Sequence, residues 1–316
     1  MTPWIDTRAV TLYDPLTRPA SVLGLELLAI AIAGLTLWHA VRSHRRGDRA
    51  ALLTWVTILV YGVTIEIIVY NAVDNFAHAQ FTVMFYDRLL PLYVTAIYPV
   101  LLYTGIATAR RLGLPPLVEA FAAGALIVAM DAPFDVVGPV AGWWVWYDTD
   151  PNIAYRWLGV PVTSYYWHLT FGGTLAAVTA WTAARSARPG GPRLWLALPS
   201  AVATMVIGFL CFVPLHLLAA VGVSHGVTVA TALVGCAAAA IVARKKGGAT
   251  RGVDRALLLI WLAFYGYHAV VAAALANASI AGWPVRFAFV GVVAVAAAVV
   301  ALPPRPWGPW ARARAA

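Results

Sequence analysis

The chain has 316 residues, of which 62% are hydrophobic and 11% are charged. A soluble domain carries about 25% charged residues, so this composition excludes a soluble globular protein and indicates an all-α, polytopic integral membrane helix bundle. The formal net charge of +9 does not indicate nucleic-acid binding, because the basic residues follow the membrane topology described below. We expect a single integral membrane domain over residues 1–316 and membrane lipids as its surroundings.

Nine apolar stretches are long enough to cross roughly 30 Å of hydrocarbon as helices. In chain order they cover residues 20–41, 50–71, 89–109, 115–137, 164–184, 194–216, 225–243, 256–276 and 284–302. Residues 1–19 carry Asp6 and Asp14 and have no apolar core. They are therefore expected to form an outer segment rather than a signal peptide, and residues 303–316 a cytoplasmic tail.

Basic residues divide unevenly between the two sides of this topology. The first interhelical loop and the C-terminal tail lie on the same side of the membrane in this topology. That side holds all but five of the Lys and Arg residues. The five on the opposite side are Arg8, Arg18, Arg88, Arg156 and Arg286. Because cytoplasmic loops are enriched in Lys and Arg, the N-terminus is expected outside and the C-terminus in the cytoplasm. The high Ala, Arg, Val and Gly content favours a bacterial plasma membrane protein.

Two parts of the chain have a similar order of features. The second and third predicted helices follow the pattern of an acid near the outer end, Glu66, and then a loop with Tyr86-Asp87. The fourth and fifth repeat it with Asp131 and Tyr147-Asp148. This order indicates a weak parallel duplication, which in membrane proteins often builds a site between the repeats. Chance similarity explains it equally well, because no long identical string is shared.

Three carboxyl groups in these helices are candidates for catalysis. Asp131 and Asp135 are four residues apart, so they share one face of a helix, and Pro133 between them predicts a kink. Glu66 lies about 7–8 Å inside the end of its helix, in the same leaflet as Asp131. Acids in a membrane helix are costly, and apolar surroundings favour their neutral, proton-donating form. Alternatively, neighbouring Tyr, Asn or His side chains bind these acids, which then only hold helices together.

Aromatic residues gather beside the acids and have two interpretations. They can form an interfacial belt, or they can line a cavity in which ring faces stabilise a carbocation. His168 can orient an acid or a water molecule, and His216 and His268 can face the same cavity. The candidate substrate-contacting residues are Tyr86, Trp143, Trp144, Trp146, Tyr147, Tyr165, Tyr166, Trp167 and His168.

The residues around these acids resemble one known family, the membrane carotenoid-biosynthesis hydratases of the bacterioruberin and γ-carotene 1,2-hydratase type. The resemblance covers roughly residues 60–170. It departs after Gly159-Val160-Pro161, where the chain continues with Ser164-Tyr165-Tyr166-Trp167-His168. The matching residues are Glu66, Tyr86, Pro91, Asp131 or Asp135, Gly142, Trp144, Trp146, Gly159, Val160 and Pro161.

The resemblance implies addition of water across a terminal isoprenoid C=C bond. An acid protonates the alkene, aromatic faces stabilise the resulting cation, and water oriented by Asp135 or His168 adds to it; an internal alkene can instead close a ring. The substrate is a lipid-soluble small molecule, and no metal or other cofactor is expected.

Two other functions fit the same residues. A small proton- or cation-coupled transporter uses carboxylates along a path, although transport favours acids at several depths and these acids cluster near the outer side. A structural or sensory membrane protein needs no chemistry at all. Convergence of Glu66 and Asp131 on one cavity distinguishes the enzyme, since the enzyme interpretation requires it.

Overall fold

The computed structural model describes residues 3–73, 75–148, 151–186, 194–245 and 254–276. Within these residues the chain is mainly helical, and seven helices are long and apolar enough to cross a membrane. It is therefore a multi-pass membrane protein. The seven segments are Ala20–Arg45, Arg49–Ala72, Leu92–Arg110, Pro116–Val137, Leu194–Ala220, His225–Ala243 and Arg255–Leu275.

The predicted helices are found close to their expected positions. Five of the seven segments are formed by single helices: α1 (Ala20–Arg45), α2 (Arg49–Ala72), α5 (Pro116–Val137), α10 (His225–Lys245) and α11 (Arg255–Ala276). The predicted span 164–184 is α7 (Val162–Arg185), which is not among the seven and has a polar first half with Ser164 and His168. The predicted span 284–302 and the tail 303–316 lie outside the described residues. The count of nine, the sidedness and the duplication remain predictions.

Two spans are interrupted. The third consists of α3 (Leu92–Tyr98), a π-helical turn (Pro99–Tyr103) and α4 (Thr104–Arg110), because Pro99 lacks the N–H that would continue the α-helical pattern. Another is divided into a 3₁₀ turn (Leu194–Leu196), α8 (Ala197–Leu210) and α9 (Val213–Ala220). By contrast, α5 continues as a helix through Pro133.

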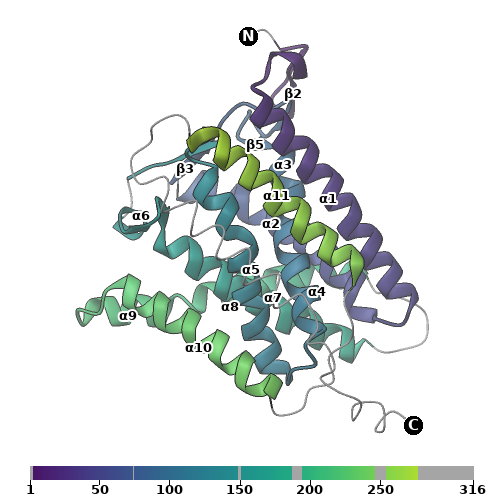
Figure 1. The fold of residues 1–316 in the computed structure, drawn as a ribbon, viewed down its shortest axis with the longest axis vertical. Coiled ribbons are helices and arrows are strands. Elements are labelled where there is room, and N and C mark those ends of the chain that lie inside the picture. The colour runs from purple at the N-terminus through teal and green to yellow at the C-terminus, as the bar shows by residue number, and fades with distance from the viewer. Residues whose placement is uncertain (1–2, 74, 149–150, 187–193, 246–253, 277–316) are drawn as a thin grey trace.

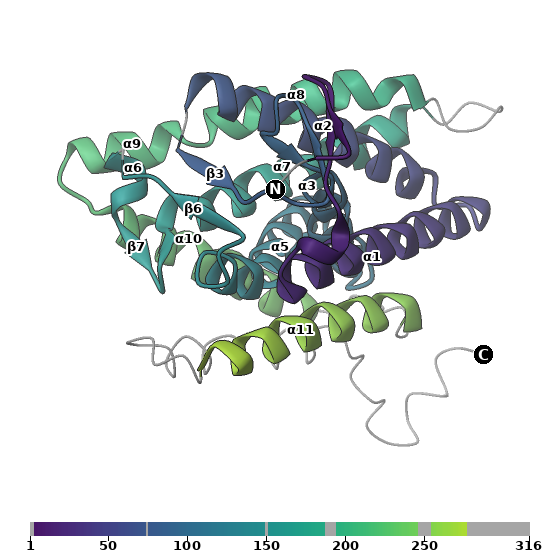
Figure 2. The same ribbon diagram turned by 90° about the horizontal axis from the view of Figure 1, so that it is seen from above.

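The centre of the bundle is the pair formed by α5 and α7. Figure 2 shows α7 lying between α8 and α5, with α11 on the far side of α5. A Cβ atom on Gly124 would lie 2.2 Å from the backbone oxygen of Leu169, and one on Gly173 would lie 3.0 Å from that of Ala120. Glycine therefore allows the two backbones to approach closely, as small residues do in membrane helix pairs.

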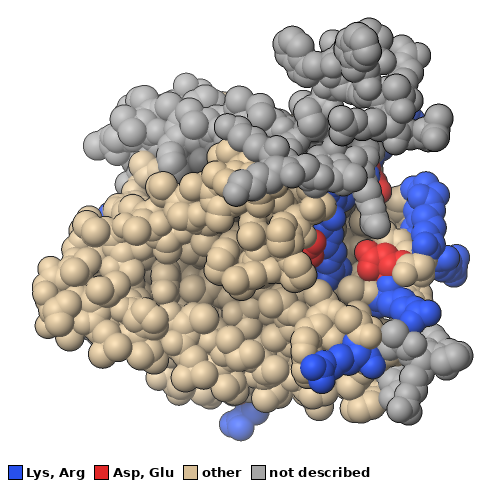
Figure 3. All heavy atoms as spheres, turned by 90° about the horizontal axis from the view of Figure 1, so that it is seen from below, with Lys and Arg blue, Asp and Glu red and all other residues tan. Residues whose placement is uncertain are grey.

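Basic residues gather at one end of the bundle. The Arg110 side chain donates hydrogen bonds to Thr54 at 2.9 Å and to Thr179 at 3.4 Å, so one end each of α2, α4 and α7 meet there. At α11, Asp254 lies 3.2 Å from His39 and 3.7 Å from Arg111. Figure 3 shows Lys and Arg on one side of this face, beside a broad uncharged surface.

The opposite end carries short strands, which the all-α expectation did not include (Figure 1). A four-stranded antiparallel sheet joins the N-terminal segment to the loop before α3. It comprises, in order, β1 (Ile5–Asp6), β2 (Val10–Leu12), β4 (Val83–Phe85) and β5 (Leu90–Pro91).

Two further strand pairs lie at this end. Strands β3 (Phe76–His78) and β6 (Trp144–Trp146) pair antiparallel, and so do β7 (Arg156–Trp157) and β8 (Val160–Pro161). Between β6 and β7 lies the short helix α6 (Pro151–Ala154). The β3–β6 pair links the loop that follows α2 to the loop that follows α5.

Candidate functional site

Glu66 is held near the end of α2 by a residue of α3. The hydroxyl of Tyr98 donates a hydrogen bond of 2.6 Å to Glu66 Oε1. The other carboxyl oxygen, Oε2, makes no hydrogen bond to any described residue, although the hydroxyl of Tyr70 is a neighbour. Only 7% of Glu66 is exposed. Tyr98 therefore fixes one oxygen of this acid, while the other lies near the Tyr70 hydroxyl.

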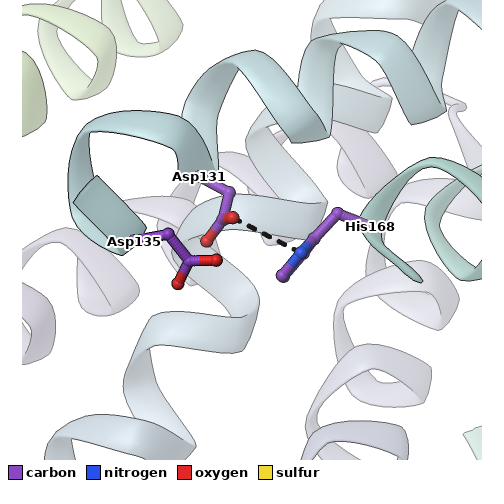
Figure 4. A group of neighbouring side chains, drawn as sticks. All are labelled: Asp131, Asp135 and His168. Carbon is purple, nitrogen blue, oxygen red and sulfur yellow. Dashed lines mark ion pairs between the residues drawn. The ribbon is translucent and has the colours of Figure 1, made fainter. Parts of the chain in front are cut away.

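Asp131 and Asp135 lie one turn apart on α5 and face α7, as their spacing predicts (Figure 4). Both are buried, with 1% and 5% of each residue exposed. The Ser164 hydroxyl donates a hydrogen bond of 2.7 Å to Asp135 Oδ2. On Asp131, neither oxygen makes a hydrogen bond to any described residue.

His168 completes this group from α7. Its Nδ1 lies 3.3 Å from Asp131 Oδ2 and 2.9 Å from the carbonyl oxygen of Ser164. A carbonyl oxygen can only accept, so Nδ1 carries the proton and donates it to Ser164. Asp131 is thus within ion-pair distance of the ring, but the hydrogen bond of His168 Nδ1 is to the carbonyl oxygen of Ser164. Asp131, Asp135 and His168 each offer one atom that lies within 4.8 Å of the others, and these residues can hold a metal ion.

One cavity of about 250 Å³ is lined by all four titratable residues described above: Glu66, Asp131, Asp135 and His168. The convergence of Glu66 and Asp131 that the enzyme interpretation requires is present in the structure. The cavity lies toward the end that carries the strands, since β3, β6 and the first half of α7 contribute to it. Its apolar walls are formed by Ile65, Val69, Val73, Phe76, Val94, Ile97, Leu101, Phe134, Trp144, Trp146, Ile153, Pro161, Trp167 and Phe212.

The β3–β6 pair brings two of the predicted aromatic residues to this cavity. Phe76 lies opposite Trp146 and His78 lies opposite Trp144. Successive side chains on a strand alternate between its faces, so Trp144 and Trp146 share a side while Val145 between them is exposed. Trp167 also lines the cavity and stacks on Phe171 with ring centroids 4.0 Å apart.

The other predicted aromatic residues do not line the cavity. Trp143 is fully buried behind it, stacked on Tyr267. The hydroxyls of Tyr165 and Tyr166 bond to the carbonyls of Trp157 and Cys211. These three are therefore packing residues rather than cavity walls.

Tyr86 and Tyr147 also lie outside the cavity lining. Tyr86 has a positive φ of 52° and exchanges hydrogen bonds with the side chain of Asn71 on α2. Tyr147 follows β6, and its backbone N–H donates to the carbonyl of Asn75 at 2.8 Å. In both cases the course of the loop places the residue outside the cavity. The presence of a neighbouring acid in the sequence does not determine that course.

Several cavity residues were not predicted from sequence. Phe134 lies between the two aspartates in the chain, and Phe76 and His78 come from β3. His216 lines the cavity as considered possible, whereas His268 packs against Phe264 and Phe134 instead. Burial lowers the pKa of His78 to about 3, so this strand residue is neutral.

Comparisons with known proteins give one match. A family profile described as "Domain of unknown function (DUF7802)" matches residues 14–272. No curated protein matches the chain. No solved structure matches it either.

Proposed function

The chain belongs to the DUF7802 family, whose description states no activity, and we propose that it is an intramembrane enzyme acting on a lipophilic isoprenoid. The proposed reaction is protonation of a C=C bond, followed by hydration or cyclisation. The observation that carries this proposal is the convergence of Glu66, Asp131, Asp135 and His168 on one cavity with largely apolar and aromatic walls.

Glu66 is the proposed proton donor. Its Oε1 is fixed by Tyr98, while Oε2 has no hydrogen bond among the described residues. The O–H bond of the neutral acid breaks as its proton forms a C–H bond with one alkene carbon, using the π electrons. A tertiary cation remains at the other carbon. The ring faces of Trp144, Trp146 and Trp167 stabilise that positive charge.

The α5–α7 group completes the reaction. Asp131, Asp135 and His168 hold a water molecule, whose oxygen forms the new C–O bond as one of its protons passes to Asp135 or His168. The net change is addition of one H and one OH across the double bond. In cyclisation, a second alkene of the same chain attacks the cation, and a proton then leaves the ring. Return of a proton to Glu66 closes the cycle.

The size of the cavity bears on the substrate. Pockets for drug-sized ligands are commonly 300–1,000 Å³, and this cavity has about 250 Å³. It therefore takes one end of a long isoprenoid, a carotenoid among them, while the remaining chain extends into lipid. The proposed topology has nine spans in a bacterial plasma membrane with the N-terminus outside, which places the cavity in the outer leaflet. The substrate therefore enters the cavity from the bilayer.

The test is expression in a host that makes lycopene, with pigments analysed by mass. Hydration adds the mass of one water molecule to the pigment, and cyclisation changes its retention time without changing its mass. Glu66→Gln and Asp131→Asn are expected to abolish the product. Glu26→Gln is the matched control, because Glu26 is a buried acid that accepts backbone N–H bonds from Thr82 and Val83 and does not line the cavity.

The transporter alternative predicts a different result. An unchanged pigment and lipid profile, together with proton-coupled uptake of a solute that Glu66→Gln abolishes, would show that these acids form a transport path.

A further inference from the structure

We propose that Asp131, Asp135 and His168 form a binding site for one divalent transition metal ion. No metal is expected from the sequence, because the implied addition of water to an alkene needs none. In the fold, two carboxylates one turn apart on α5 face an imidazole on α7, and Figure 4 shows all three side chains pointing toward one another. One ligand atom from each lies within 4.8 Å of the other two.

Asp131 provides an independent observation. This residue is 1% exposed, and both of its oxygens lack a hydrogen bond to any described residue. Burying a carboxyl group without a hydrogen bond is costly in an apolar interior, and the nitrogen of His168 that lies 3.3 Å from Asp131 already donates to Ser164. A cation placed between Asp131 and Asp135 removes that cost by direct coordination.

Ser164 orients two of the three ligands. Its hydroxyl donates to Asp135 Oδ2 at 2.7 Å, and its carbonyl accepts from His168 Nδ1 at 2.9 Å. With the proton on Nδ1, His168 keeps a lone pair on Nε2. Histidines that bind metals commonly donate their second ring N–H to a carbonyl, and their carboxylate partners are hydrogen-bonded in turn. Ser164 supplies both supports.

The ligand types indicate the class of ion. One nitrogen and two carboxylate oxygens suit Zn²⁺, Mn²⁺ or Fe²⁺, whereas Mg²⁺ and Ca²⁺ prefer oxygen alone. Bonds of about 2.1 Å place two ligands of one ion no more than about 4.2 Å apart. One candidate ligand atom of each residue lies within 4.8 Å of the other two, so the side chains must draw closer, with Nε2 of His168 turned toward the carboxylates, to bind one ion. Three protein ligands leave a coordination position open, as in catalytic zinc sites.

This inference goes beyond the proposed reaction and does not depend on it. If the reaction takes place, the open position is where the attacking water is held. Metal binding is measured without substrate, so a protein that binds metal but leaves pigments unchanged would refute the reaction and retain the site. Product formation by a protein that binds no metal would refute the metal site and retain the reaction.

The experiment uses the full-length chain, purified in detergent through a tag that contains no histidine and treated with a chelator. Titration calorimetry with Zn²⁺ is expected to show one site per chain, and elemental analysis one retained zinc. Asp131→Asn, Asp135→Asn and His168→Gln are expected to weaken binding more than about 100-fold, and Ser164→Ala about 10- to 100-fold. Glu26→Gln is the matched control, because it removes a buried acid that does not line the cavity.

Cobalt provides a second measurement that does not depend on loss of binding. Co²⁺ in the site is expected to give visible d–d absorption, and His168→Cys is expected to retain the ion and add a sulfur-to-cobalt charge-transfer band. The absence of any Zn²⁺ or Co²⁺ site in the wild-type chain would overturn the proposal. Unchanged binding in all three ligand variants would also overturn it.

Discussion

The hydroxyl group of Tyr265 on α11 donates a hydrogen bond of 2.5 Å to the carbonyl oxygen of Ala129 on α5. Ala129 lies four residues before Pro133, so its carbonyl is the one that lacks a helical N–H partner. A buried carbonyl without a donor is costly, and the tyrosine of a neighbouring helix satisfies it. This bond explains how α5 continues through Pro133 and keeps Asp131 and Asp135 on one face.

The first prediction concerns this bond. Tyr265→Phe is expected to lower the free energy of unfolding by about 1–3 kcal/mol, because it leaves the Ala129 carbonyl unpaired. Thermal unfolding in detergent measures the change. The control is a double-mutant cycle with Pro133→Ala, which restores the helical N–H. In that background Tyr265→Phe should cost clearly less, and equal costs in both backgrounds would show that the hydroxyl has another role.

The second prediction concerns the α5–α7 contact. Gly124→Ala is expected to destabilise the protein by about 1–3 kcal/mol, because the added Cβ atom overlaps the backbone oxygen of Leu169 at 2.2 Å. Gly235→Ala is the matched control, since nothing lies within 4 Å of its Cβ position. There alanine should be neutral or stabilising by up to about 1 kcal/mol. Similar melting temperatures for the two variants would contradict the close contact.

The third prediction is a pH dependence that arises from His78. Burial lowers its pKa from 6.5 to about 3, so the unfolded chain binds this proton at a higher pH than the folded chain. The stability that His78 contributes is complete above pH 6.5 and is lost as the pH falls toward 3, by at most about 1.4 kcal/mol per pH unit. Unfolding curves between about pH 7 and 4 should therefore be flatter for His78→Asn than for the wild type. Parallel curves would mean that His78 is accessible to protons in the fold.

The fourth prediction concerns the hydrogen bond to Glu66 and rests on the proposed reaction. Tyr98→Phe should reduce turnover of the substrate by up to roughly tenfold, because a hydrogen bond of this kind is worth about 0.5–1.5 kcal/mol. Tyr93→Phe is the control, since its hydroxyl pairs with His78 Nδ1 at 3.0 Å rather than with Glu66. Equal rates for the two variants would remove Tyr98 from the site.

The parts of this fold that follow from helical geometry were predictable from sequence. Runs of apolar residues set the spans, and the fixed rise per residue placed Glu66 and Asp131 at similar depths. The spacing of Asp131 and Asp135 gave their common face. His168 was predicted near these acids because it lies within the first turns of its helix, at the same end of the bundle. Each of these inferences requires only the regular geometry of a single helix and the fact that successive helices cross the membrane in opposite directions.

The residues that the sequence did not predict depend on loops. The duplication and the family resemblance predicted Tyr86 as a site residue, but Tyr86, Asp87 and Arg88 all have positive φ and form a turn outside the cavity lining. Trp143 was grouped with Trp144, yet it lies just before β6 and packs on Tyr267, outside the cavity lining. Antiparallel pairing of β3 with β6 is a long-range contact, which no local pattern in either loop encodes. His78 and Phe76 reach the cavity only through that pairing.

The close approach of α5 and α7 has a consequence for the thermodynamics of binding. Asp131 and Asp135 are carried by one helix and His168 by the other, and their separation is set where the Gly124 backbone meets that of Leu169. The polar group is thus preorganised: its conformational entropy is lost when the chain folds, before any ion or substrate arrives. Binding at this site should therefore carry a small ordering penalty and leave the two helices almost unmoved.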